Sequence, residues 1–151
     1  MATFTFEWNP WVPESPGPCI RISVAGYIDD IESGKLLGLE YDAPSIPTAL
    51  IDTGSPFTII NTTLAKKANL SLTNPKFPIT TISGDCVCEE YGGSISFPGS
   101  GLPRINAVQI LARDLSQKAY ACILGRNILK RWKICFDGRN SSVTIIVPDP
   151  I

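Results

Sequence analysis

The chain alternates short apolar or β-branched runs with polar turns along most of its length. Positions 19–24 and 142–147 alternate apolar and polar residues, which predicts half-buried strands. Positions 120–124 are nearly all apolar, as in a strand that is buried on both faces. Thirteen prolines and twelve glycines separate these runs. The pattern therefore predicts an all-β domain with few and short helices.

The same pattern predicts further strands and one hairpin. The additional strands are expected over 34–39, 48–51, 107–111 and 133–136. The hairpin is expected over 79–97, because Ser83-Gly84-Asp85 is a turn signal between two β-like segments.

Two short helices are also expected. The first covers 62–68, with Asn61 as its N-cap and Asn69 as a left-handed stop. The second covers 126–132, where apolar residues recur at helical spacing.

Residues 1–18 differ in composition from the rest of the chain. They include two tryptophans and four prolines, which are Pro10, Pro13, Pro16 and Pro18. Proline cannot donate a backbone hydrogen bond, so we expect an extended, proline-rich arm over 1–18. Residues 19–151 are expected to form one domain, because the chain is too short for two ordinary ones.

The net charge of the chain and the composition of its segments indicate which kinds of binding partner to expect. The formal net charge is -1, with 13 basic and 14 acidic residues and no long basic run, so we expect neither nucleic acid nor anionic lipid as a partner. The first residues lack the basic start and apolar stretch of a signal peptide, and no window reaches membrane-spanning length. These features predict a cytoplasmic protein without a membrane partner.

The five cysteines are expected to be reduced thiols, because their number is odd and no export signal is visible. Cys86 and Cys88 are separated by one residue, but the chain has no histidine, so the common zinc spacings are missing. We therefore predict neither a metal site nor a cofactor.

Asp52-Thr53-Gly54-Ser55 is the segment with the clearest chemistry. It is a carboxylate on a tight polar loop between the apolar runs 48–51 and 56–60. No other aspartate of the chain is followed by Thr-Gly or Ser-Gly. Two facing carboxylates hydrolyse a peptide bond when one activates water and the other protonates the departing nitrogen. Ser55 is expected to donate a hydrogen bond to the Asp52 carboxylate.

A second segment makes a chance occurrence of this motif a weaker explanation. Together with residues 49–55, the stretch Cys122-Ile123-Leu124-Gly125-Arg126-Asn127-Ile128-Leu129 resembles the retropepsin group of aspartic proteases, which includes the retroviral proteases and their single-domain bacterial and cellular relatives. In that family the residues matching Ile123, Leu124 and Gly125 form the strand end that holds the catalytic loop. The residues matching Arg126 and Asn127 open the well-formed helix.

The resemblance implies a retropepsin-type acid protease fold: a small closed β-barrel-like domain with one or two short helices and a β-hairpin flap. It implies a homodimeric aspartic endopeptidase in which each protomer contributes one Asp52, supported by Thr53, Gly54 and Ser55. Thr53 would make reciprocal hydrogen bonds across the two-fold axis. The flap would cover a peptide or protein substrate with Ile82, Ser83, Gly84 and Asp85, and no cofactor or metal would be needed. Val87 and residues near Ile123 are expected in the subsites.

The sequence departs from the retroviral pattern at three places. The first is the proline-rich arm, which could cover the site, order the dimer or be removed by self-cleavage. Pro56 stands where an acidic residue would pair with Arg126, which leaves the role of Arg126 open. The flap segment carries Asp85, Glu89 and Glu90, which could favour basic substrates or simply be solvated. Two alternatives to the protease remain: a catalytically weak peptide-binding or assembly module of the same fold, and a structural β domain with a chance motif.

Overall fold

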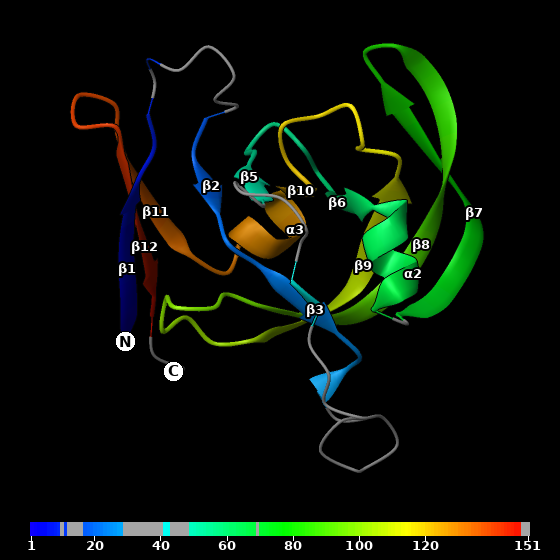
Figure 1. The fold of residues 1–151 in the computed structure, drawn as a ribbon, viewed down its shortest axis with the longest axis horizontal. Helices are drawn as coiled ribbons and strands as arrows, with labels where there is room; N and C mark the ends of the chain where they lie inside the picture. Colours follow the sequence, from blue (N-terminus) through cyan, green and yellow to red (C-terminus); the bar gives the residue numbers. More distant parts are fainter. Residues whose placement is uncertain (10, 12–16, 29–40, 43–48, 69, 149–151) are drawn as a thin grey trace.

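The computed structural model describes residues 1–9, 11, 17–28, 41–42, 49–68 and 70–148. The described chain is mostly β: a large sheet curls into a half-barrel, and a small sheet stands beside it (Figure 1). The predicted all-β class is therefore confirmed. The strand expected over 34–39 and the stop expected at Asn69 lie outside the described residues.

The large sheet has one continuous path of strands. In sheet order these are β2 (Cys19–Ile20), β5 (Ala49–Ile51), β10 (Cys122–Leu124), β6 (Thr58–Asn61), β9 (Ile105–Arg113), β8 (Gly84–Ser96), β3 (Ser23–Ala25) and β4 (Tyr41–Asp42). Strand β7 (Ser71–Thr81) pairs with β8 off this path. Strand β10 runs parallel to β5 and antiparallel to β6. It therefore lies between the strand that precedes the Asp52 loop and the strand that follows it.

The small sheet joins the two ends of the chain. Its order is β1 (Ala2–Glu7), β12 (Ser142–Val147) and β11 (Lys133–Asp137), all antiparallel. The first part of the predicted arm over 1–18 is thus a sheet strand. The sequence signal for this strand is the alternation of apolar Ala2, Phe4 and Phe6 with polar residues. In the structure these three residues are half-buried against the core, and the residues between them are exposed.

Two helices were expected and two are described, both shorter than predicted. Helix α2 covers Thr62–Lys67 and helix α3 covers Arg126–Leu129. Asn61 makes no capping hydrogen bond; instead its Oδ1 accepts a hydrogen bond from the Leu115 N–H at 3.3 Å. Asn61 is therefore the N-cap residue, as predicted, but its side chain does not cap the helix, because the Leu115 N–H of a distant loop takes its acceptor.

Several strands also differ from their predicted bounds. The strand expected over 19–24 is interrupted at Arg21 and Ile22, which separates β2 from β3. Strand β7 starts at Ser71, well before the expected start at 79, although it contains Pro75 and Pro78. Among the described strands β7 pairs only with β8. An edge strand tolerates proline because one side of it needs no ladder donors.

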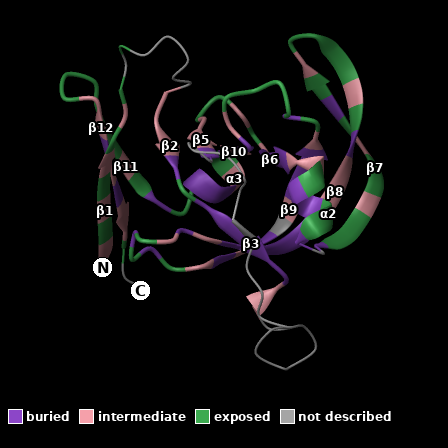
Figure 2. Ribbon diagram, in the orientation of Figure 1, coloured by how far each residue is buried: buried purple, intermediate pink, exposed green. Residues whose placement is uncertain are grey.

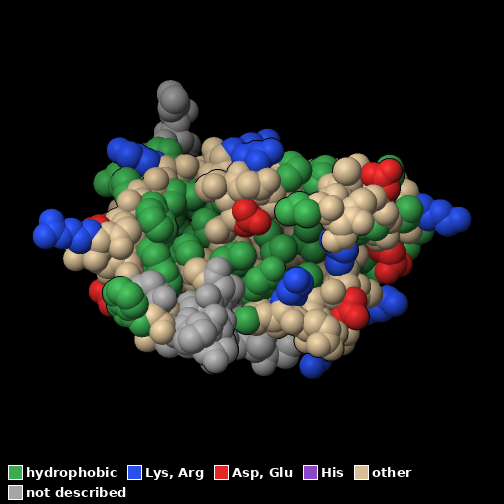
Figure 3. Space-filling model, turned by 90° about the horizontal axis from the view of Figure 1, so that it is seen from above, with side chains coloured by type: hydrophobic (Ala, Val, Ile, Leu, Met, Phe, Trp, Pro, Cys, Tyr) green, Lys and Arg blue, Asp and Glu red, His purple; other side chains and the backbone are tan. Residues whose placement is uncertain are grey.

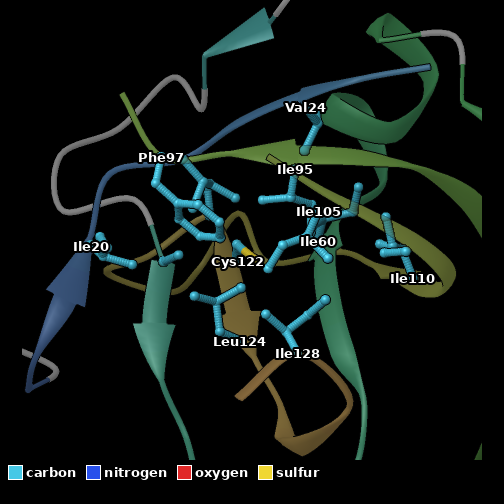
Figure 4. Close-up of a cluster of buried hydrophobic side chains, with 14 of the residues drawn as sticks. Ile20, Val24, Ile60, Ile95, Phe97, Ile105, Ile110, Cys122, Leu124 and Ile128 are labelled. Atoms are coloured by element: carbon cyan, nitrogen blue, oxygen red, sulfur yellow. The ribbon is translucent and has the colours of Figure 1, made fainter. Parts of the chain in front are cut away.

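The core lies inside the curl of the large sheet and extends under the small sheet (Figure 2). Figure 4 shows Ile60, Ile95, Ile110 and Leu124 converging on it from four different strands. A second, smaller cluster under the β7–β8 hairpin contains Ile59, Ile79, Cys88, Leu111 and Leu115. Neighbouring residues Ile59 and Ile60 belong to different clusters, so both faces of β6 are covered. The described residues include no helix long and apolar enough to cross a membrane.

Candidate active site

The loop that carries Asp52 is held by the segment from β10 to α3. The Asp52 N–H donates to the Leu124 carbonyl at 3.0 Å, and the Arg126 N–H donates to the Ser55 carbonyl at 2.8 Å. The Arg126 side chain adds a third bond, from Nη1 to the Thr53 carbonyl oxygen at 2.8 Å. The structure therefore brings the two sequence motifs together. It also gives Arg126 a partner: a backbone carbonyl of the loop in place of an acidic side chain.

Gly125 allows this close approach. A Cβ at position 125 would lie 2.1 Å from the carbonyl oxygen and 2.4 Å from the carbonyl carbon of Phe57. Real Cβ atoms do not come that near to backbone atoms, so any side chain here would push the Asp52 loop and β10 apart. The glycine of the second motif is thus explained by backbone packing rather than by a turn.

A buried polar network supports the same junction. Thr58 Oγ1 accepts a hydrogen bond from the Gly125 N–H at 3.2 Å and donates to Asn127 Oδ1 at 2.8 Å. Asn127 Nδ2 donates to the Gln109 carbonyl at 2.9 Å. The network ties β6, β9 and α3 together around the loop. The sequence analysis missed Thr58; the only signal was a hydroxyl in the apolar run after the aspartate.

The Asp52 carboxylate is half-buried and lines a groove at the surface. Its Oδ1 accepts a hydrogen bond from the Gly54 N–H at 2.9 Å. Ser55 Oγ donates to the Phe57 carbonyl at 2.7 Å. A hydroxyl has a single proton to donate, so the expected bond from Ser55 to Asp52 is wrong. Ser55 stabilises the loop backbone, while Thr53 and Gly54 are exposed beside the carboxylate.

A groove of about 490 Å³ opens next to Asp52. The turn after β5, the tip of the β7–β8 hairpin and the loop between β9 and β10 all lie at the top of Figure 1 and surround it. Seen from this side, hydrophobic side chains spread over the middle of the face around an acidic group (Figure 3). The apolar lining includes Phe57, Ile59, Ile79, Leu115, Tyr120 and Ile123. Such a lining suits apolar side chains of a bound chain.

The predicted flap residues divide into two groups. Ile82 and Ser83 form the hairpin tip and line the groove with Asp52, and Ile82 is fully exposed. Gly84 begins β8 with a positive φ of 116°, which glycine adopts without strain. Asp85 lies in a separate depression with Val87. Asp85 and Val87 do not line the groove beside Asp52. The expectation that Val87 belongs to the subsites there is therefore not met.

The end of β9 and the loop that follows it form a wall of the groove that the sequence analysis did not identify. Arg113, Leu115 and Lys118 line it together with Tyr120. Its residues have no recognisable spacing, because only the parallel pairing of β6 with β9 brings them next to the Asp52 loop. The sequence contained no local signal for this neighbourhood.

The cysteines lie in different environments, and all five are free thiols. Cys88 belongs to the second apolar cluster, and burial raises its pKa. Burial also raises the pKa of Cys19 to about 11 and that of Cys122 well above its usual range. Over the part of the chain that is described, no three side chains of the metal-binding types gather into a possible ligand set.

Comparisons with known proteins identified no relative of this chain. No protein-family model matches the chain, and searches among curated proteins and among solved structures found no match either. The function of the chain is therefore inferred from its own residues and contacts.

Proposed function

We propose that this protein is an aspartic endopeptidase of the retropepsin type, which acts as a homodimer with one Asp52 from each protomer. The β7–β8 hairpin serves as the flap, and the groove beside Asp52 receives part of the peptide. The observation that carries the proposal is the Asp52 loop itself: a half-buried carboxylate, held at three points by the β10–α3 segment, facing an apolar groove.

The exposed side of the loop supports the dimer. Thr53 and Gly54 are exposed, although they stand next to the proposed reacting carboxylate. A two-fold axis beside them would place two identical loops face to face, which is the isologous geometry common in homodimers. The exposed Thr53 side chain would then hydrogen-bond to the partner loop, while its carbonyl accepts from Arg126 within its own protomer.

The chemistry follows from the proximity of two carboxylates. Carboxylates about 3 Å apart cannot both carry a charge, so the pair shares one proton. The ionised member takes a proton from water, which attacks the peptide carbonyl. The protonated member hydrogen-bonds the carbonyl oxygen and later supplies a proton to the departing nitrogen. Activity should be highest on the acidic side of neutrality, and an optimum near pH 9 would contradict this mechanism.

Cleavage of a broad peptide library, read by mass spectrometry, tests the proposal. The wild-type chain should cleave peptides at bonds between apolar residues, and Asp52→Asn should abolish cleavage while retaining the fold. Asp114→Asn is the matched control, because Asp114 also lines the groove but has no role in the proposed reaction. Cleavage that survives Asp52→Asn would refute the proposal.

The alternative of a binding module predicts a different result. Such a module would bind the peptides without cleaving them, and it would not distinguish a statine-type transition-state mimic from an ordinary peptide. A protease should bind the mimic much more tightly, by about a hundredfold or more. The intact Asp52-Thr53-Gly54-Ser55 loop favours the protease, because a pure binding groove has no need of this loop and its half-buried carboxylate.

A further inference from the structure

We propose that Arg113 and Lys118 make the groove selective for peptides that carry an acidic side chain close to the apolar residues at the cleaved bond. This inference rests on the proposed function, because it requires the groove to receive a peptide. Both basic residues line the groove beside Asp52, together with Leu115 and Tyr120 of the same wall. Apolar and basic surfaces are therefore adjacent within one binding site.

Two cations and two acids line the groove: Arg113, Lys118, Asp52 and Asp114. Asp52 is required for the reaction. Asp114 Oδ1 accepts a hydrogen bond from the Ser116 N–H at 2.9 Å, and hydrogen bonds from Ser116 hold the pKa of this carboxyl below its usual range. Asp114 therefore stays ionised, with its Oδ1 held toward its own loop. Apart from the reacting carboxylate, Arg113, Asp114 and Lys118 sum to a charge of +1, which favours an acidic over a basic side chain in the peptide.

The acidic residues of the hairpin do not oppose this. Asp85 accepts a hydrogen bond from Thr80 Oγ1 at 2.8 Å and lies outside the groove. Glu90 accepts hydrogen bonds from Thr73 Oγ1 at 2.7 Å and from Gln109 Nε2 at 3.0 Å. Glu89 accepts a hydrogen bond from the Tyr91 hydroxyl and does not line the groove either. The basic substrate preference that these acids suggested in the sequence is therefore not supported by their positions.

The two cations differ in what they contribute. Arg113 is half-buried at the end of β9, so its charge is less screened by water than a fully exposed one. Its guanidinium can bind a carboxylate with two parallel hydrogen bonds. Lys118 is exposed on the loop and adds a mobile positive charge. A glutamate or aspartate in the peptide would pair with them, whereas a lysine at the same position would be repelled.

Peptide binding to the Asp52→Asn variant tests this selectivity separately from cleavage. The probes are short peptides with a central pair of apolar residues and with Glu, Gln or Lys at each flanking position in turn. At one or more flanking positions, the Glu peptide should bind about three- to tenfold more tightly than its Gln counterpart, and the Lys peptide more weakly than both. Adding Lys118→Glu should remove or reverse this order.

Lys67→Glu is the control, because Lys67 is an exposed cation on α2 that does not line the groove. It changes the net charge equally and should leave the order intact. Equal binding of Glu and Gln peptides at every position, an unchanged order in Lys118→Glu, or no peptide binding at all would overturn the inference. Glu-selective binding together with a wild-type chain that cleaves nothing would instead refute the proposed function and retain the selectivity.

Discussion

The guanidinium of Arg126 donates to the backbone carbonyl of Thr53 at 2.8 Å, and the backbone N–H of the same arginine donates to the Ser55 carbonyl at 2.8 Å. One residue of α3 thus bonds to two positions of the loop that carries Asp52. This double contact makes the direction of the Asp52 carboxylate depend on a segment more than seventy positions away in the chain.

Replacing Arg126 should therefore loosen the loop without unfolding the protein. Arg126→Ala removes the bond to Thr53 but keeps the backbone bond to Ser55. We expect a loss of about 1 kcal/mol in the free energy of unfolding, because the side chain is exposed. The value of kcat should fall about tenfold, because the carboxylate is less well positioned. Lys130→Ala, an exposed neighbour just after the helix, should change neither quantity.

Gly125→Ala should be far more damaging. The new Cβ would meet the Phe57 backbone at 2.1 Å, and backbone atoms of a packed loop cannot move aside at low cost. We expect a loss of roughly 3 kcal/mol or more, measured by chemical denaturation. At Gly138 an added Cβ would meet only the Phe136 ring, at 3.3 Å. Gly138→Ala should therefore be nearly neutral, and equal effects of the two substitutions would contradict the packing explanation.

These contacts show which parts of the site the sequence could predict. The loop and the β10–α3 segment were recognisable because each is a short, contiguous motif with its own turn chemistry. Their partners were not. Thr58 and the Arg113 to Lys118 wall reach the site only through the pairing of β6 with β10 and β9, and pairing partners cannot be inferred from local periodicity.

Two strands near prolines were not predicted with their observed bounds. Pro10 to Pro18 suggested an unpaired arm, yet the alternation just before them forms β1. The hairpin was expected to start at 79, yet β7 begins at Ser71 and includes Pro75 and Pro78, which one edge free among the described strands allows. By contrast, 142–147 was predicted with the observed bounds, because its alternation has no interruption.

The buried thiols predict a loss of stability in alkali. Burial raises the pKa of Cys19 from 9.0 to about 11, so the unfolded chain loses this proton at a lower pH than the folded chain. This contribution to stability is fully present below pH 9 and is lost as the pH rises to about 11. Denaturation measured across this window should show a shallower decline for Cys19→Ala than for wild type. Cys135→Ala, which removes an exposed thiol, should follow the wild type.

The hairpin tip predicts an effect on substrate binding. Ile82 lines the groove but is fully exposed in the free chain, so a bound peptide or partner protomer should bury it. Ile82→Ser should raise KM about tenfold and leave the free energy of unfolding unchanged within about 0.5 kcal/mol. Val87→Ser is the matched control, because Val87 is also an exposed apolar residue of the hairpin but lies outside this groove. An equal rise in KM for both variants would exclude a specific role of the tip.

The most direct test of the shared site mixes wild-type chains with Asp52→Asn chains. Equal amounts are allowed to exchange protomers, and peptide cleavage is compared with that of wild type at the same total concentration. If each site needs Asp52 from two protomers, only wild-type pairs are active, and activity should fall to about a quarter. Activity of about one half would mean that each chain works alone, which would contradict the proposal that Asp52 is half of a site.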